Sequence, residues 1–527
     1  MKRVLLACLF LAFLAGCASL PLGAKDPRTP SHALVHPEVT RLGARFIEAA
    51  HQHAGNSGYR MLSAGVDGLL TRLETIDAAE RTVDLQYYIF HEDETGKLVS
   101  AALLRAADRG VKIRILVDDG ETIPGDEQLF TLDGQHGIEV RVFNPFAYRG
   151  HNRAVRAAEY LFRHPRLDYR MHNKLLIADN VVALIGGRNI GAQYFQVDPD
   201  SQFADDDLFV VGPLAQQLSA GFDEFWNSVF AIPAASVAHR RLPRGPPANK
   251  PSERADRTPQ GIRDTDYAQR LAAGEPFKAM TSEALSLSWA RAQVLFESPD
   301  KKRARNRGAI GCLTFAPLAD AARDTQTELL MVTPYFVPTQ AESKLLTDLR
   351  ARGVRVRILT NSLESAPELS AHSGYVRARL RLLKVGVEFH EVRSLLGSTQ
   401  GSGQTRKLSR FGNYALHAKL YVFDRRQVVI GSMNFDQRSN WLNTEDGLII
   451  ESPAIAQQVA ARFEAMTSLE NAYSVSLGAA AAEKSPHLLW KTIENGRTAE
   501  YDREPARSTW QKFKVRVLSL VPLDREL

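Results

Sequence analysis

The chain has 527 residues, of which 44% are hydrophobic and 24% charged, with 35 Gly, 25 Pro and only 3 Cys. These fractions are ordinary for a folded protein, and they exclude a disordered chain, a collagen-like repeat and a disulfide-rich scaffold. A chain of this length is expected to form roughly two to four domains. The 66 Lys and Arg exceed the 60 Asp and Glu, and the resulting net charge of +6 suggests nucleic acid unless processing removes part of it.

The first residues have the features of a bacterial lipoprotein signal peptide. Lys2 and Arg3 precede an apolar run over residues 4–15, which is shorter than the roughly twenty residues that a membrane-spanning helix needs. The run ends in Leu14-Ala-Gly-Cys17, which resembles the lipobox, where cleavage precedes a cysteine that becomes acylated. The alternative is an ordinary signal peptide with a chance cysteine. We expect lipid modification of Cys17, a net charge lowered to +4 by loss of Lys2 and Arg3, and a protein anchored to the membrane without crossing it.

An internal repeat fills most of the remaining chain. Residues 109–116 (RGVKIRIL) return as residues 352–359 (RGVRVRIL), an offset of 243. Further along, residues 137–140 (GIEV) match residues 386–389 (GVEF), an offset of 249. Drifting offsets are typical of duplicated domains that carry loop insertions.

The repeat predicts the same secondary structure in both halves. A strand-like stretch with aromatic residues precedes each copy, at residues 82–90 and 328–336. A run of helical period lies between, at residues 98–107 and 343–351. Each half is therefore predicted as strand, helix, strand, helix, strand, an α/β unit with right-handed crossovers and largely buried strands.

The rest of the chain divides around these halves. Prolines among Arg, Lys and Ser over residues 233–259 predict an exposed extended segment, and a helix is expected near residues 283–294. The repeat gives no guidance after about residue 465. The predicted parts are a signal peptide (1–16), a tether (17–60), a first half (61–232), a linker (233–280), a second half (281–465) and a C-terminal extension (466–527).

The residues that can carry chemistry recur at equivalent positions of both halves. Each half has a His-x-Lys pair, then an aspartate, then a Gly-rich segment that ends in asparagine, and the two histidines lie 245 residues apart. One such match is expected by chance on the order of 0.01–0.1 times in a chain this long, so two in register are a specific signal. The copies are His172-Asn-Lys174 with Asp179 and Gly186-Gly-Arg-Asn189, and His417-Ala-Lys419 with Asp424 and Gly431-Ser-Met-Asn434.

Each motif is predicted to lie on a β-hairpin. The strand after each lysine turns at Asp179 or Asp424 and runs back. A histidine and a lysine two residues apart on a strand point to the same face, and the glycines allow backbone or substrate to approach closely. The two aspartates complete the motif, but their place at the turns favours a structural role over a chemical one.

This set of residues suits the cleavage of a phosphodiester. One neutral imidazole can attack phosphorus while a second, protonated one supplies a proton to the leaving oxygen. Lysine and asparagine side chains can hold the non-bridging oxygens, and a carboxylate behind each histidine would fix its tautomer, with Asp205 and Glu445 as aligned candidates. A chance pair on a surface strand would explain one motif but not two. A zinc site is disfavoured because the lysines would repel the metal, so no metal or cofactor is expected.

The duplicated motif resembles that of the phospholipase D superfamily, over roughly residues 60–232 and 280–465. The resemblance implies two α/β sandwich halves that form a pseudo-dimer around one shared active site, and a metal-independent reaction through a phosphohistidine. By that similarity His172 is the nucleophile and His417 the general acid and later base, an assignment that follows family habit. The same similarity gives phosphate binding to Lys174, Lys419, Asn189, Asn434 and Ser432, and orientation of the histidines to Asp205 and Glu445.

Within the superfamily, the segments at residues 88–96, 116–119, 170–174 and 185–191 look most like the bacterial cardiolipin synthase C group. The resemblance implies transfer of a phosphatidyl group from phosphatidylethanolamine to phosphatidylglycerol, at a membrane surface and without nucleic acid. A phospholipase D that uses water would share every catalytic residue. A nuclease of the superfamily is opposed by the low net charge, and a non-catalytic binding protein by two intact motifs.

The expected location is the bacterial cell envelope, facing the periplasm. Ala18 after Cys17 argues against retention at the inner membrane, where cardiolipin synthesis is expected, so the choice of membrane stays open. Two further segments bear on the membrane. The cationic run at residues 301–307 is either a solvated loop or a headgroup contact. The alternating run at residues 510–518 predicts an edge strand or packed tail, with a membrane-resting segment as the alternative.

Overall fold

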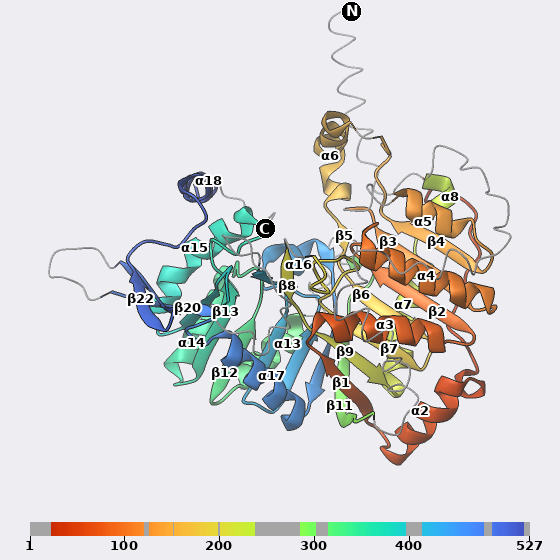
Figure 1. The fold of residues 1–527 in the computed structure, drawn as a ribbon, viewed down its shortest axis with the longest axis horizontal. Helices are drawn as coiled ribbons and strands as arrows, with labels where there is room; N and C mark the ends of the chain where they lie inside the picture. The colour runs from red at the N-terminus through yellow and green to blue at the C-terminus, as the bar shows by residue number, and fades with distance from the viewer. Residues whose placement is uncertain are drawn as a thin grey trace, which may run out of the picture.

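The computed structural model describes residues 23–120, 126–150, 152–198, 201–237, 285–301, 315–396, 414–478 and 487–520. Two α/β halves lie side by side in Figure 1, the first in red to yellow and the second in green to blue, and the predicted fold class is confirmed. The predicted signal peptide with Cys17 and most of the Pro-rich linker fall outside the described residues, so the lipid anchor stays a prediction. Within the described ranges, no helix is both long and apolar enough to cross a membrane.

The first half is a mixed sheet in the order β10–β4–β3–β2–β6–β7–β9–β1. Strands β2, β3 and β4 are parallel and are joined through α4 and α5, as the repeat predicts, while the other neighbours are antiparallel. Its strands are β1 (Ser57–Leu62), β2 (Thr82–Tyr87), β3 (Lys112–Asp118), β4 (Ile138–Phe143), β5 (Arg170–Met171), β6 (Lys174–Ala178), β7 (Val182–Gly186), β8 (Gln202–Ala204), β9 (Asp207–Val211) and β10 (Ala231–Pro233). Its helices are η1 (Pro37–Val39), α2 (Arg41–Gln52), α3 (Gly65–Ala78), α4 (Glu94–Asp108), α5 (Asp126–Asp133), α6 (Arg153–Leu167), α7 (Pro213–Trp226) and α8 (Ala234–Val237).

The second half repeats this plan in the order β11–β19–β17–β16–β12–β13–β14–β20–β21–β22. Strands β12, β13 and β14 are parallel and are joined through α14 and α15. Its strands are β11 (Ser288–Phe296), β12 (Glu328–Val332), β13 (Arg355–Asn361), β14 (Glu388–Val392), β15 (Tyr414–Leu416), β16 (Leu420–Phe423), β17 (Gln427–Gly431), β18 (Asn443–Thr444), β19 (Asp446–Glu451), β20 (Ala472–Leu477), β21 (Leu488–Glu494) and β22 (Arg497–Tyr501). Its helices are α13 (Phe315–Asp324), α14 (Gln340–Ala351), α15 (Leu369–Lys384), α16 (Gln437–Trp441), α17 (Pro453–Met466) and α18 (Thr509–Leu518).

The repeated Arg-Gly-Val sequence is the C-terminal cap of a helix in both halves. Gly110 and Gly353 follow α4 and α14 with φ of 88° and 87°, the left-handed conformation that glycine adopts without steric cost. The next residues, Val111 and Val354, donate their N–H groups back to Ala106 and Leu349 at 3.1 Å, and both valines are buried. The motif thus ends each helix and aims the chain into the next strand.

The two halves share strands and core. Strand β11 pairs with β1 through residues 288–290 and with β19 through residues 291–296, so it links the two sheets. One hydrophobic cluster takes in side chains of both halves, including Phe225 and Trp226 of α7 with Phe463 of α17. The helix expected near residues 283–294 is therefore wrong from residue 288 onward, because pairing with two neighbouring strands outweighs the local helix-forming composition.

The segments outside the repeat pack against the halves. Residues 41–60, predicted within the tether, form α2 and most of β1, and Phe46 of α2 contacts Phe209 in the hydrophobic core of the first half. Strands β20–β22 of the C-terminal extension lengthen the second sheet. The edge strand expected at residues 510–518 is wrong, because the Ser508 hydroxyl caps a helix there by accepting from Gln511 N at 3.1 Å. The alternative of a packed tail agrees with the contact between this helix and α15.

The two motif hairpins are confirmed. Strands β6 and β7 pair across a three-residue turn, as do β16 and β17, and both turns begin at the motif aspartate with positive φ. The Asp179 carboxylate accepts from the backbone N–H groups of residues 80–82 at 2.8–2.9 Å, and Asp424 accepts from those of residues 326–328 at 2.7–3.0 Å. Each aspartate lies one strand length away from its histidine. The two aspartates tie the turn to the start of β2 or β12, which agrees with the structural role that their place at the turns favours.

Asp179→Ala is expected to lower the free energy of unfolding by about 2 kcal/mol, because three backbone donors lose their acceptor. Denaturant unfolding measures this loss, and Asp424→Ala is the matched variant in the other half. The folded fraction of each variant should keep kcat within about threefold of wild type. A hundredfold loss of kcat in a variant of unchanged stability would contradict the structural role.

Candidate active site

The two histidines lie where the halves are tied together. A short parallel ladder joins β5 of the first half to β18 of the second, and another joins β8 of the first to β15 of the second. His172 follows β5 and donates its backbone N–H to Thr444 O at 2.9 Å, while His417 follows β15 and donates to Ala204 O at 2.8 Å. Each ladder ends beside a carboxylate, because Glu445 follows β18 and Asp205 follows β8.

Each histidine is paired with the carboxylate of the opposite half. His172 Nδ1 lies 2.8 Å from Glu445 Oε2, and His417 Nδ1 lies 2.5 Å from Asp205 Oδ2. Both carboxylates are fully buried, and both imidazole side chains are at most 9% exposed. A carboxylate at Nδ1 holds the proton there and leaves the lone pair on Nε2 for chemistry. The sequence predicted Asp205 and Glu445 as partners but did not say which histidine each would serve.

The Glu445 carboxylate is held by hydroxyl groups. Ser432 Oγ donates to Glu445 Oε2 at 2.5 Å and accepts from Asp446 N at 2.9 Å, while Ser439 Oγ donates to Glu445 Oε1 at 2.7 Å. Ser432 was predicted to bind phosphate. In the structure its hydroxyl is committed to Glu445, so it acts through His172.

A buried ion pair between Glu297 and Lys301 supports the backbone of Glu445. Glu297 Oε2 accepts from Glu445 N at 3.0 Å and from Lys301 Nζ at 2.8 Å, and Lys301 also donates to two backbone carbonyls. Lys301 is thus buried, and neither alternative given for the cationic run, a solvated loop or a headgroup contact, holds for it. Residues 302–307 lie outside the described residues.

The lysines lie beside the histidines within each half. Lys174 Nζ donates to His172 O at 2.6 Å, and Lys419 Nζ lies 3.0 and 3.1 Å from the two ring nitrogens of His417. Burial lowers the pKa of Lys174 to about 8 against the pull of Glu445, and burial lowers the pKa of Lys419 to about 7 with Lys174 as a second cause. For both lysines, burial thus outweighs the attraction of the neighbouring carboxylates, so the binding of an anion would stabilise the charged form.

The histidines are neutral in this arrangement. Burial lowers the pKa of His172 to about 4 despite Glu445, with further lowering by Lys174 and by Lys419 of the other half. Burial likewise lowers the pKa of His417 to about 3, with further lowering by Lys419 and by Lys174. Since each lysine acts on the histidine of the opposite half, both motifs belong to one site.

Aromatic rings that the sequence analysis did not single out as site residues contact both imidazoles. Tyr88 packs edge-on against His172 with centroids 5.1 Å apart, and Tyr194 does the same against His417 at 5.0 Å. Phe203 stacks on His417 at 5.4 Å and also contacts Tyr194 at 5.1 Å, so the three rings form one cluster. Tyr194 and Ser439 occupy equivalent positions at the motif offset of 245, so extending the repeat alignment would have pointed to both.

The asparagines differ between the halves. Asn189 Oδ1 accepts from Ile89 N at 3.1 Å, which ties its side chain to the end of β2. Asn434 Oδ1 is buried and has no hydrogen-bond partner among the described residues. Asn434 is thus the better placed of the two predicted phosphate ligands to rearrange around a substrate.

The glycines of the motifs make room for the neighbouring strand. A Cβ at Gly431 would lie 2.2 Å from Asp446 O, and a Cβ at Gly186 would lie 2.5 Å from Asp206 O. A Cβ at Gly187 would lie 2.0 Å from Asp205 Oδ1. The close approach expected from the sequence is therefore made by backbone at Gly431, by backbone and the Asp207 carboxylate at Gly186, and by the carboxylate partner of His417 at Gly187.

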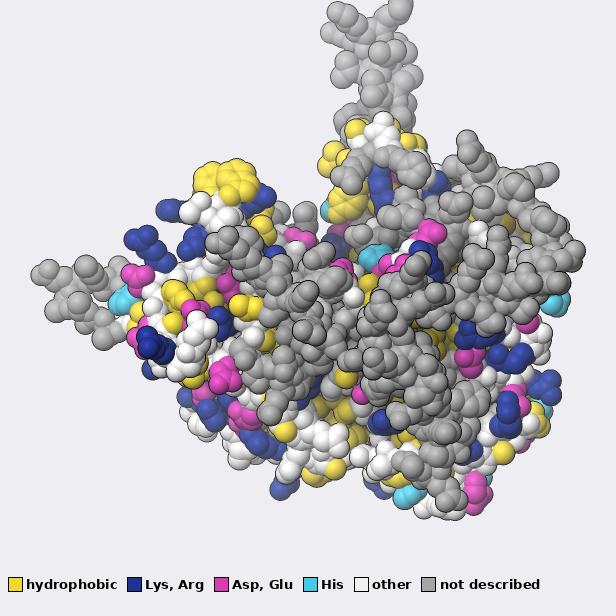
Figure 2. All heavy atoms as spheres, viewed as in Figure 1, with side chains coloured by type: hydrophobic (Ala, Val, Ile, Leu, Met, Phe, Trp, Pro, Cys, Tyr) yellow, Lys and Arg dark blue, Asp and Glu magenta, His cyan; other side chains and the backbone are white. Residues whose placement is uncertain are grey.

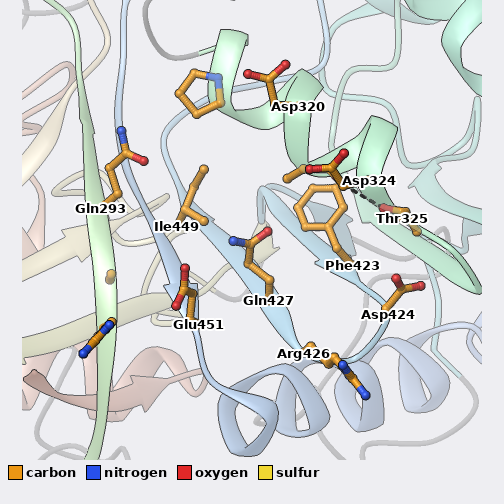
Figure 3. A pocket seen from close by; sticks show the side chains of 14 residues that line it. Gln293, Asp320, Asp324, Thr325, Phe423, Asp424, Arg426, Gln427, Ile449 and Glu451 are labelled. Atoms are coloured by element: carbon orange, nitrogen blue, oxygen red, sulfur yellow. Dashed lines mark hydrogen bonds between the residues drawn. The ribbon is translucent and has the colours of Figure 1, made fainter.

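A separate hollow of about 720 Å³ lies at the opposite end of the motif strands (Figure 3). Gln293, Asp320, Asp424 and Glu451 are among its lining residues, and Asp424 is one strand length away from His417.

Within the described part of the chain, no group of three His, Cys, Asp or Glu side chains is placed to hold a metal ion.

Comparison with known proteins places this site in a family. A family model described as "Cardiolipin synthase, PLD-like domain" matches residues 73–226 and 318–467, one segment in each half. The chain belongs to the phospholipase D superfamily. Within the superfamily it is an enzyme of the cardiolipin synthase-like, phosphatidyltransferase kind, and the resemblance drawn from the duplicated motif is confirmed.

Individual relatives of this phospholipase D-superfamily enzyme agree with that assignment. Cardiolipin synthase C of Escherichia coli (strain K12) is 32% identical over 92% of this chain and 99% of its own length. The major cardiolipin synthase of Bacillus subtilis (strain 168) is 24% identical over 77% of this chain and 67% of its own length. The crystal structure of phosphatidylserine synthase from Haemophilus influenzae Rd KW20 has the same fold, with a TM-score of 0.52 at 15% identity over 81% of this chain and 91% of that one.

Gly187→Ser is expected to lower kcat by about a hundredfold, because its Cβ would displace Asp205 from His417. The matched change Ser432→Gly removes one hydrogen bond to Glu445 without a clash, so we expect about a tenfold loss. Steady-state kinetics of the two variants tests whether Gly187→Ser loses more kcat than Ser432→Gly. Equal losses, or a larger loss for Ser432→Gly, would contradict it.

The lowered pKa values of Lys174 and Lys419 predict that kcat/KM falls on the basic side of its pH profile. An unliganded lysine loses its charge as the pH rises through its pKa, so kcat/KM should fall between about pH 7 and pH 8. A bound phosphodiester anion raises the pKa of both lysines, so the fall in kcat should come at higher pH. Lys419→Arg, whose guanidinium stays charged, should move the fall in kcat/KM to higher pH. A kcat/KM profile that stays flat to pH 9 would show that these lysines remain charged.

Proposed function

We propose that this enzyme makes cardiolipin by transferring a phosphatidyl group to phosphatidylglycerol, with phosphatidylethanolamine as the donor. The observation that carries the proposal is the pair of cross-half His–carboxylate contacts beside two buried lysines of lowered pKa. That site fits a phosphodiester, and the relative of 32% identity that matches nearly full length is named a cardiolipin synthase. The lysines and Asn434 are proposed to hold the phosphate oxygens.

In the first step, His172 Nε2 attacks phosphorus and the bond from phosphorus to the headgroup oxygen breaks. Glu445 at Nδ1 stabilises the positive charge that develops on the imidazole. His417 donates a proton from Nε2 to the leaving oxygen. Binding of the phosphodiester anion offsets the charge of Lys419, which raises the pKa of His417 and lets it carry that proton.

In the second step, His417 accepts the proton of the acceptor hydroxyl, and the resulting oxygen attacks phosphorus as the bond to His172 breaks. Phosphatidylglycerol as acceptor gives cardiolipin, and water gives phosphatidic acid. The two reactions use the same residues, so the acceptor decides between a transferase and a hydrolase.

The test is product analysis with the purified protein and vesicles of both phospholipids. We expect cardiolipin from the wild type and a loss of at least about a thousandfold for His172→Ala and for His417→Ala. Phosphatidic acid without cardiolipin would identify a hydrolase instead. DNA cleavage that His172→Ala abolishes would identify a nuclease.

The roles of the two histidines can be separated with an activated leaving group. A phosphatidyl ester of p-nitrophenol needs little protonation to depart, so His417→Ala should still release one equivalent of p-nitrophenol in a burst. His172→Ala should show no burst, because no phosphohistidine can form. The reverse pattern would exchange the roles of the two histidines.

A further inference from the structure

Helix α6 presents an apolar face to solvent and a polar face to the protein. Glu159 accepts from Ala147 N and Tyr148 N at 2.8 Å, and Arg156 donates to the carbonyls of residues 119–120 at 3.2 Å, so these charged side chains point inward. Leu161 is 75% exposed. Between residues 154 and 167 the most exposed residues are apolar, namely Ala154, Val155, Ala157, Leu161, Phe162 and Pro165, while the side chains of Arg163 and His164 are only 36% and 37% exposed. A helix that only met water would have the opposite arrangement.

Helix α18 carries a second exposed apolar stripe. Trp510, Phe513 and Val517 recur at helical spacing and are 60%, 54% and 45% exposed, and the Trp510 and Phe513 rings stack with centroids 5.2 Å apart. Lys514 and Arg516 are exposed on either side of the stripe, and the helix contains no acidic residue. Exposed aromatic residues flanked by cations are typical of helices that lie in a membrane interface.

Both helices stand at the edge of the sheets where the histidines lie. Helix α6 leads through β5 directly to His172. Helix α18 is fixed by a hydrogen bond of 2.7 Å from Gln511 to Leu363 O, just after Asn361, and Asn361 in turn bonds the backbone of Leu416 beside His417. Both helices project from the upper side of the molecule in Figure 1, and Figure 2 shows the apolar side chains at both places, with dark-blue cationic side chains next to those of α18.

We propose that α6 and α18 together form the surface that docks on an anionic phospholipid bilayer and turns the active site toward it. The apolar side chains would enter the boundary between headgroups and acyl chains, and the cations of α18 would meet the phosphate groups. Two separate ridges on one side of the molecule fit a deformable lipid surface. A second copy of the chain fits less well, since a twofold contact through α18 would bring together two helices that carry cations and no acidic residue.

The proposal rests on the proposed function only in expecting a substrate that resides in the bilayer. Docking can be measured without catalysis, so the two can fail separately. Trp510 is the most exposed of the five tryptophans, at 60%, which makes it a reporter for the α18 stripe.

The experiment is fluorescence quenching of the full-length protein on vesicles of phosphatidylglycerol and phosphatidylethanolamine with brominated acyl chains. We expect stronger quenching in the wild type than in Trp510→Phe, which keeps an apolar ring but removes the reporter. His417→Ala should be quenched like the wild type even though it is inactive. Equal quenching of the wild type and Trp510→Phe would show that Trp510 does not enter the bilayer. That result would overturn the proposal even if another segment holds the protein on the vesicle.

A triple variant, Leu161→Ser with Phe513→Ser and Val517→Ser, tests the consequence for turnover. We expect its activity on vesicles to fall about tenfold more than its activity on a dispersed short-chain substrate. The matched control, Val35→Ser with Val39→Ser, changes two apolar side chains that are 79% and 64% exposed elsewhere and should leave the vesicle activity unchanged. Equal losses on both substrates, or an oligomer of the wild type that the triple variant dissociates, would overturn the proposal.

Discussion

The contact on which the site depends is a hydrogen bond between a histidine of one half and a carboxylate of the other. It occurs twice, between His172 and Glu445 and between His417 and Asp205. Because each imidazole takes its orientation from the opposite half, neither half alone contains a complete histidine–carboxylate pair. The short ladders β5–β18 and β8–β15 lie beside these two contacts. They fix the backbone of each histidine next to the segment that supplies its carboxylate.

Burial gives this contact its chemical effect. Two lysines, two carboxylates and two imidazoles share an interface from which water is largely excluded, and the lysines lower the pKa of both histidines. With both histidines neutral, the two lysines balance the two carboxylates. In the proposed reaction the negative charge of the phosphodiester therefore offsets the proton that His417 takes up, so substrate binding does more than position the phosphorus atom.

Much of this arrangement could be predicted because the sequence contains an internal repeat. The repeat identifies the strand–helix–strand units, the hairpins, the motif residues and the two carboxylates, each of which has a counterpart at the matching position. What the repeat does not reveal is where the halves differ or meet. Tyr194 and Ser439 align but have different chemistry, and the strand β11 is formed by pairing with partners that are remote in sequence. The helix α18 has no repeat partner, and its alternation of apolar and basic residues is equally compatible with a strand.

The position of β11 has a consequence for solubility. Without it, β1 and β19 would each end a sheet with a row of unpaired backbone groups, and open sheet edges invite pairing between molecules. By pairing with both, β11 joins the two sheets into one strand order that, among the described residues, ends at β10 and β22. The first of these strands is three residues long, and the second carries Arg497 and Glu500 as exposed charges. The fusion of two halves into one chain thus guards the enzyme against aggregation as well as assembling its active site.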